Sequence, residues 1–545
     1  MSLNTLPAEI KHQIVQDATP DGFEGIALTC KSFFDVSQPL IHEYNRKKRR
    51  FGSFRYSRHS ADADCDAPGD KTTCTDLDHW DDTTAATGEI ITDVFGLLAL
   101  VLRNPDIGRF IHSLDLKHPR VLLPFDDRMA GLGFAHIAAT NINVGFGAHG
   151  LDPVVLGNRG PGGIRGPSPH WDEEDEANLR RFLSHPIFGE EEEVLEDAST
   201  YDLDTVSIVE AEIWLLNLLP NVKEIALSKA WAYEIPPNRM KELERIAKRA
   251  NDPEIPNASL SQLTVMKPFV GHGYVSVTPL SHFTPFLSLK SLKEFYMGGV
   301  KAWGTNPVEC YFDTKSLTLG DGLTKIELNG SCIGIPELSD LLDLTPNLKS
   351  LSLGLETKPN SAGRSYDIGR MISVIGSQIG NVIEELAIVN HPMHWATTSP
   401  ASMSDFQRLK SFEIEAQLDT YEDNFVTLPL VDMLPPSLET TKLYSRDLAR
   451  EGEVVANMTK LLRGFRDERP TKLPKLVEID LISPLLGISR GSRELSAATR
   501  IAAEAGVRVQ HPDMRQCISK FTRTFNSRFG VTDAEVDNRP DIILP

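Results

Sequence analysis

Features that define several common protein classes are missing from this 545-residue sequence. Its six cysteines, at positions 30, 65, 74, 310, 332 and 517, form no paired framework, so we expect free thiols in a reducing compartment. The longest apolar stretch, residues 94–102, has about half the length that a membrane-spanning helix needs. The first ten residues lack the basic region and apolar core of a secretory signal. These absences predict a cytoplasmic protein with no membrane partner.

The sequence also has fewer basic than acidic residues. The chain has 56 Lys and Arg against 76 Asp and Glu, which gives a net charge of −20. A surface this acidic repels nucleic-acid phosphate, so we expect no nucleic acid among the partners. One basic run, RKKRR at residues 46–50, is interpreted either as a nuclear-localisation patch or as the solvated end of a helix, which leaves the nucleus as an alternative location.

Motifs for catalysis, cofactors and metals are absent as well. The sequence has no G-x-S-x-G and no H-E-x-x-H, and its glycine-rich stretch at 157–166 lacks the G-K-S/T ending of a phosphate loop. Four potential zinc ligands lack the C-x-x-C turn that would bring them together: His59, Cys65, Cys74 and His79. We therefore expect no catalytic residue, no metal and no cofactor, and we predict that the chain is not an enzyme.

What the sequence does contain is a recurring hexad with the pattern apolar-x-x-apolar-x-apolar. Its first apolar residues are at positions 222, 260, 292, 323, 348, 383, 409, 438 and 476, and Thr441 is its one weak position. Between hexads, residues 336–344, 367–383 and 452–465 have helical periodicity. Such strand-loop-helix units bury their apolar faces only by stacking, which predicts an α/β chain with one parallel sheet and an outer layer of helices.

The hexads resemble the L-x-x-L-x-L core of leucine-rich repeats, although the Asn or Cys that usually follows is mostly absent and the spacing is longer. The resemblance implies an irregular solenoid over residues 201–510. A helix at 89–102 and a strand at 111–116 predict a first helix-strand unit of the array within residues 89–130. Residues 494–509 would add a closing helix and strand.

The N-terminal segment has the periodicity of three short helices over residues 3–45. It resembles the F-box in Leu6-Pro7-Ala8-Glu9-Ile10, in Ile14 and in Leu28-Thr29-Cys30-Lys31-Ser32-Phe33, and it departs from that family at residues 40–44, where a Trp-Arg pair is common. F-box proteins bind the Skp-type adaptor of cullin-RING ubiquitin ligases. The resemblance therefore implies that Leu6, Pro7, Ile10, Ile14 and Leu28 lie at or near that interface.

Composition divides the remaining chain into connecting segments. We predict an F-box at 1–48, a disordered linker at 49–88, an acidic and Gly/Pro-rich insertion loop at 131–200 and a C-terminal tail at 511–545. The acidic clusters at 172–176 and 190–197 are interpreted as solvated loop charge. An alternative is that residues 1–48 form a helical cap on the array, but a polar linker would separate them from it.

Strand alternation predicts which hexad residues face outward. The fourth and sixth positions point to the core and the fifth faces out, which places Ala226, Thr264, Ser352 and Ala387 on the outer face. The same positions supply the expected target-binding residues Tyr296, Glu327, Glu413, Lys442 and Asp480, with the aromatic Tyr296 as the main anchor. An alternative is recognition by the insertion loops.

Together these patterns predict a substrate-recognition adaptor of a Skp-cullin-F-box type ubiquitin ligase. It would bind the Skp-type adaptor, and through it a cullin, by its N-terminus and an unknown target protein by its repeat array. The alternatives are a leucine-rich-repeat scaffold without a ligase link and an enzyme whose site lies in the insertion at 131–200.

Overall fold

A computed structural model describes most of the regular part of the chain. The described residues are 5–55, 91, 93–117, 171–184, 203–232, 235–268, 278–302, 322–355, 366–390, 396–397, 403–415, 429–444, 461–482, 493–510 and 528–529. They form a mixed α/β fold. The chain separates into two compact units, one made of Met1–Phe54, Gly108–Asp115 and Leu216–Pro545, the other of Arg55–Ile107 and Leu116–Leu215. The predicted first unit of the array, residues 89–130, is thus divided between them.

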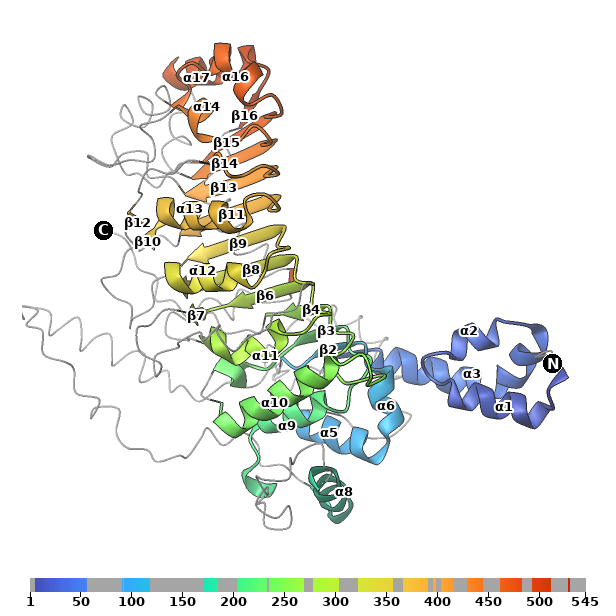
Figure 1. The fold of residues 1–545 in the computed structure, drawn as a ribbon. Coiled ribbons are helices and arrows are strands. Elements are labelled where there is room, and N and C mark those ends of the chain that lie inside the picture. Colours follow the sequence, from blue (N-terminus) through green and yellow to red (C-terminus); the bar gives the residue numbers. More distant parts are fainter. Residues whose placement is uncertain are drawn as a thin grey trace, which may run out of the picture. The chain divides into compact units, whose positions relative to one another are not determined.

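The larger unit is built on a 14-stranded sheet (Figure 1). Its main path follows the chain order β1-β2-β3-β4-β6-β8-β9-β11-β13-β14-β15-β16, and β5 and β7 pair beside it. The strands from β2 onward pair in parallel. The strands are β1 Ser53–Arg55, β2 Ser113–Asp115, β3 Glu224–Ala226, β4 Val265–Lys267, β5 Thr278–Pro279, β6 Glu294–Gly298, β7 Val300–Ala302, β8 Lys325–Ile333, β9 Ser350–Leu355, β11 Glu385–Asn390, β13 Ser411–Glu415, β14 Thr440–Tyr444, β15 Glu478–Ile482 and β16 Arg508–Gln510. A separate two-stranded sheet pairs β10, Tyr366–Asp367, with β12, Ala396–Thr397.

Each of the nine hexads contributes a strand to this sheet. The fourth hexad residues are almost fully buried, from Ile225 at 0% exposure to Leu386 at 2%. Successive units are also joined at the second position of each hexad. There the backbone N–H of one unit donates to a backbone carbonyl of the preceding unit, as from Lys293 to Thr264 at 2.9 Å. The predicted parallel sheet is therefore confirmed.

The prediction for one hexad, at 260–265, is three residues too early in the chain. Val265 pairs with Glu224 and Glu294, so β4 follows Leu263 and not Leu260. The outward residue of this strand is therefore Lys267, which pairs with Ala226, and the prediction of Thr264 is wrong. The segment contains apolar residues at 260, 263 and 266, so the first and fourth hexad positions can be assigned in two registers three residues apart, and the observed register has Pro268 at the sixth position.

Helices connect the strands of this unit. They are α10 Pro237–Ala250, α11 Thr284–Leu287, α12 Ile335–Asp343, α13 Ile368–Ile379, α14 Leu430–Met433, α16 Phe465–Lys472 and α17 Arg493–Glu504, with 3-10 turns η5 Lys229–Ala232 and η6 Leu280–Phe283. The boundary between the two units falls within α6, Pro105–Phe110. α12 and α13 lie side by side along the sheet (Figure 1). They match the helices predicted at 336–344 and 367–383, and α17 with β16 matches the predicted closing pair. Of the helix predicted at 452–465, residues 452–460 lie outside the described residues.

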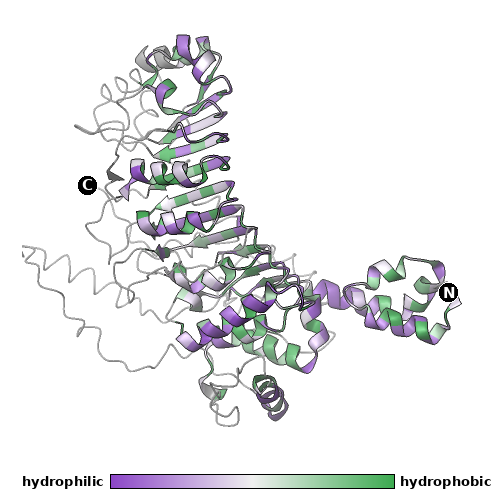
Figure 2. Cartoon of the chain, viewed as in Figure 1, coloured by the Kyte–Doolittle hydropathy of each residue, from purple (hydrophilic) through white to green (hydrophobic). Residues whose placement is uncertain are grey.

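Three helices form the N-terminal segment, namely α1 Ala8–Asp17, α2 Phe23–Ala27 and α3 Lys31–Phe51. Hydrophilic and hydrophobic stretches alternate along them (Figure 2). α3 has 21 residues and buries Phe33, Ser37, Tyr44 and Phe51, which share one face at helical spacing. The basic run at 46–50 forms its last turns, where cations favour the helix dipole. Because β1 follows at Ser53–Arg55, the linker predicted at 49–88 is wrong for residues 49–55.

The smaller unit contains α5 Val94–Arg103, α8 Glu173–Leu183, the 3-10 turn η4 Leu203–Thr205 and most of α9, Ile208–Leu216. α8 lies within the segment predicted as an insertion loop. Asp172 caps its first turn by accepting from the backbone N–H of Asp175 at 2.8 Å, and Asp175 accepts in return from the N–H of Asp172. The cluster at 172–176 is therefore a helix start and not solvated loop charge, because acidic side chains complement the helix N-terminus.

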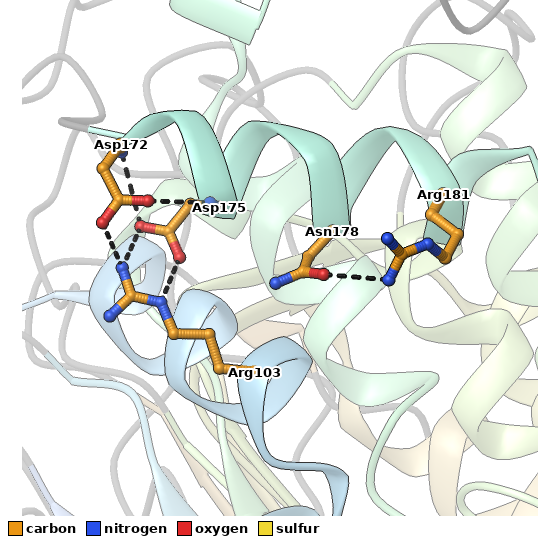
Figure 3. Close-up of polar contacts among 5 residues, drawn as sticks. All are labelled: Arg103, Asp172, Asp175, Asn178 and Arg181. Atoms are coloured by element: carbon orange, nitrogen blue, oxygen red, sulfur yellow. Dashed lines mark hydrogen bonds and ion pairs between the residues drawn. The ribbon is translucent and has the colours of Figure 1, made fainter.

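Arg103 at the end of α5 holds α8 in place (Figure 3). Its guanidinium donates to both carboxylate oxygens of Asp175, at 2.7 and 2.8 Å, and to Asp172 at 2.6 Å. Asp175 is 5% exposed, so its charge is compensated where water does not reach it. The capping bond from the Asp175 backbone, with Arg103 nearby, lowers the pKa of Asp172.

Candidate protein-binding surfaces

Helix α1 presents an apolar stripe on the N-terminal segment. Ile10 and Ile14 lie four residues apart on one side of the helix, and Leu6 precedes the helix by two residues. Ile10 is 49% exposed, while Leu6 and Ile14 are partly buried and Pro7, just before the helix, is exposed. The neighbouring stripe of Lys11 and Val15 is buried instead. The helix thus has one side in the core of the segment and one side available for contact.

Most of the large apolar side chains that are exposed in the described ranges lie in this segment. They are Ile10 at 49%, Leu28 at 79% and Phe34 at 40%, and the fourth is Val477, just before β15, at 55%. Leu28 ends α2, and Phe34 lies in the first turn of α3. Scattered apolar residues are normal on a protein surface, but three within 25 positions of one small segment point to a docking surface.

Side chains between the helices hold this surface in shape. The Lys11 Nζ donates to Ser32 Oγ at 2.6 Å, which joins α1 to α3. Phe23 of α2 stacks on Tyr44 of α3 with ring centroids 4.4 Å apart. Of the predicted interface residues, Ile10 and Ile14 therefore lie on a helix that packs on its neighbours, Leu6 and Pro7 immediately precede that helix, and Leu28 immediately follows α2.

The N-terminal segment also contacts the rest of its compact unit. The Asp21 carboxylate accepts from Arg109 at 2.8 Å and from the Asn221 amide at 2.5 Å. Tyr44 packs against Phe110, with centroids 5.6 Å apart. These contacts overturn the expectation that a polar linker keeps the segment apart from the array.

A second surface is the outward column of the sheet, formed by the fifth hexad positions. Strand register places Tyr296 beside Glu327, and Glu413 beside Lys442, which is followed by Asp480. Ser352 and Ala387 lie between the two groups. All five predicted target-binding residues thus share one column, but small residues divide them into a Tyr296–Glu327 group and a Glu413–Lys442–Asp480 group.

The second group consists of two carboxylates, Glu413 and Asp480, on either side of Lys442 in strand register. The Lys442 Nζ lies 3.4 Å from a Glu413 carboxylate oxygen. Partial burial raises the pKa of Asp480, and the nearby Glu478 carboxylate raises it further. This part of the column therefore has a net negative charge that a cationic side chain of a partner would neutralise.

The first group is occupied by two residues from the C-terminal tail. The Arg528 guanidinium donates to Glu327 at 2.6 Å and lies over the Tyr296 ring, 4.8 Å from its centroid. The Phe529 ring centroid is 4.9 Å from that of Tyr296. With these neighbours Tyr296 is 6% and Glu327 9% exposed, so the expected anchor is buried rather than open.

No sequence signal predicted this contact. Arg528 and Glu327 are 201 residues apart, and an Arg-Phe pair in a tail has no periodicity that would link it to a strand. The C-terminal tail at 511–545 was predicted as a connecting segment only, and apart from Arg528 and Phe529 it lies outside the described residues.

The described ranges contain no group of three or more His, Cys, Asp or Glu side chains that could hold a metal ion. The potential zinc ligands His59, Cys65, Cys74 and His79 lie outside those ranges, as does the glycine-rich stretch at 157–166. No helix in the described part of the chain is both long and apolar enough to cross a bilayer.

Comparison with known proteins assigns no family. No protein-family model matches the chain, and no curated protein matches it with significant similarity.

Proposed function

We propose that this chain is a substrate-recognition adaptor of a Skp-cullin-F-box type ubiquitin ligase. In this proposal residues 1–48 are an F-box that binds the Skp-type adaptor, and the sheet and its helices are an irregular leucine-rich-repeat-like solenoid that binds a target protein. The chain itself performs no chemistry. It increases the effective concentration of target lysines near the ligase's charged ubiquitin-conjugating partner.

The observation that carries the proposal is the exposure of Ile10 and Leu28. Both belong to the blocks that resemble the F-box, and both leave large apolar side chains in water on a segment of three helices. Covering a Leu or Ile side chain completely contributes about 1.5–3 kcal/mol, so a partner that covers both would gain substantial binding energy.

A pulldown with purified Skp-type adaptor tests this proposal. Wild-type chain should retain the adaptor, and Ile10→Asp with Leu28→Asp should lose it, because two charges would be placed in an apolar interface without partners. Val477→Asp is the control, since the exposure of Val477, 55%, falls between those of Ile10 and Leu28, but Val477 lies just before β15, outside the N-terminal segment. Binding that survives the double substitution, or no binding by wild type, would contradict the F-box proposal.

The second candidate is a leucine-rich-repeat-like scaffold whose N-terminal helices cap the array. The hydrogen bonds of Asp21 to Arg109 and Asn221 favour it, because a cap must be tied to the units that it covers. The adaptor pulldown separates the two candidates, because wild-type chain retains the Skp-type adaptor if residues 1–48 are an F-box and does not retain it if they are only a cap. Asp21→Ala should lower the melting temperature in either case, because it removes the hydrogen bonds to Arg109 and Asn221.

A further inference from the structure

Among the described residues of the outward column, the side chains that are buried are the small Ala226, at 1% exposure, and the large Tyr296 and Glu327. Elsewhere along the column Lys267, Ser352, Ala387, Glu413 and Asp480 are partly exposed, and Lys442 is exposed. Tyr296 and Glu327, at 6% and 9%, are buried although they lie at equivalent positions. The residues that lie on them are Arg528 and Phe529.

The contact has the composition of a small recognition site. Glu327 offers a carboxylate to the arginine, and Tyr296 offers an aromatic face to both the guanidinium and the phenyl ring. An arginine can hydrogen-bond a carboxylate and stack on an aromatic ring at the same time, which a lysine does less well. The site therefore distinguishes an arginine next to an aromatic residue from a simple positive charge.

Tyr296 is also held by residues of its own sheet. Its hydroxyl donates to Glu294 at 2.6 Å, and the Lys325 ammonium lies 5.7 Å from its ring centroid. All three residues are on neighbouring strands β6 and β8. A rigid aromatic side chain on a strand loses little conformational entropy on binding.

The occupant is partly open to solvent. The Arg528 side chain is 39% exposed, and Phe529 is partly exposed. An ion pair this open contributes little by itself, so the contact depends on the tail being tethered near the site. A free segment of the same chemistry at high local concentration would compete with it.

We propose that the Tyr296–Glu327 site binds a partner protein segment in which an arginine is followed by an aromatic residue, and that Arg528–Phe529 is the chain's own occupant of that site. The inference deepens the proposed target-binding role of the sheet, and it is independent of adaptor binding at the N-terminus. A target would have to displace the tail, so recognition would favour targets that present several such segments or a high local concentration.

Fluorescence anisotropy with the full-length chain tests the inference. The probe is a labelled synthetic peptide with the sequence of residues 526–532, NSRFGVT, and its control has Ala in place of both Arg and Phe. Arg528→Ala with Phe529→Ala should empty the site, so that this variant binds the probe at least about tenfold more tightly than wild type. Adding Glu327→Gln or Tyr296→Ala should reverse that gain, whereas adding Glu413→Gln, in the other group of the column, should not.

Nitration of tyrosine, followed by mass spectrometry, gives an independent readout on folded protein. Tyr296 should be protected in wild type and become several-fold more reactive in the Arg528→Ala, Phe529→Ala variant, because its cover is removed. Equal probe binding by wild type and the emptied variant, insensitivity to Glu327→Gln, or unchanged nitration would overturn the inference. None of these outcomes alters the adaptor pulldown, so failure here is distinguishable from failure of the F-box proposal.

Discussion

Thr441 occupies a fourth hexad position, where the other hexad strands bury an apolar side chain. It is 1% exposed, and its hydroxyl has no hydrogen-bond partner among the described residues. Phe412 and Ile479, its neighbours in register, are both fully buried. A buried hydroxyl without a partner loses its hydration and gains nothing in return, so this residue weakens the core of the sheet.

Thr441→Val should therefore stabilise the array by about 1 kcal/mol, because valine has the same shape without the unpaired hydroxyl. Urea unfolding followed by circular dichroism should show a midpoint above that of wild type. Thr440→Val, at the partly exposed position beside it, is the control and should change the midpoint little. A lowered midpoint for Thr441→Val would mean that the hydroxyl is satisfied in solution.

At the scale of elements, the strands were predictable because stacking repeats the same pattern of burial. Nine hexads predicted nine strands, and only β4 was placed in the wrong register, where apolar residues at 260, 263 and 266 allowed two choices. Helix ends were harder to predict. The apolar stripe of α3 continues to Phe51 within the basic run. The capping box of α8 lies in an acidic cluster whose composition is typical of a loop.

The α5–α8 pair depends on one arginine, which gives a prediction for this element. Arg103→Leu would leave Asp175 buried without its partner and should destabilise the attachment of α8 by about 2 kcal/mol. Hydrogen exchange over residues 173–183 should then accelerate by roughly thirtyfold. Arg181→Leu is the matched control, since Arg181 bonds only Asn178 within the same helix among the described contacts. Equal exchange in the two variants would show that packing of Leu179 and Leu183 is sufficient.

At the scale of the whole molecule, the candidate surfaces were predictable in part. The F-box-like blocks and the hexads placed Ile10, Leu28 and the outward column from local pattern alone. Contacts between distant segments were not predictable. The Asp21–Asn221 and Arg528–Glu327 contacts each join residues about 200 positions apart, and no shared periodicity links the two segments. Both contacts involve the candidate surfaces, since one ties the N-terminal segment to its unit and the other covers the expected anchor Tyr296.

The most direct test of the account is the hydrogen-exchange footprint of purified Skp-type adaptor on the full-length chain. Adaptor binding should slow exchange in α1 and α2, Ala8–Asp17 and Phe23–Ala27, because binding suppresses local opening of the helices that it covers. Exchange in strands β9 to β15 should stay unchanged. Slower exchange confined to the sheet, or no change at saturating adaptor, would contradict the claim that the N-terminal helices dock on a ubiquitin ligase.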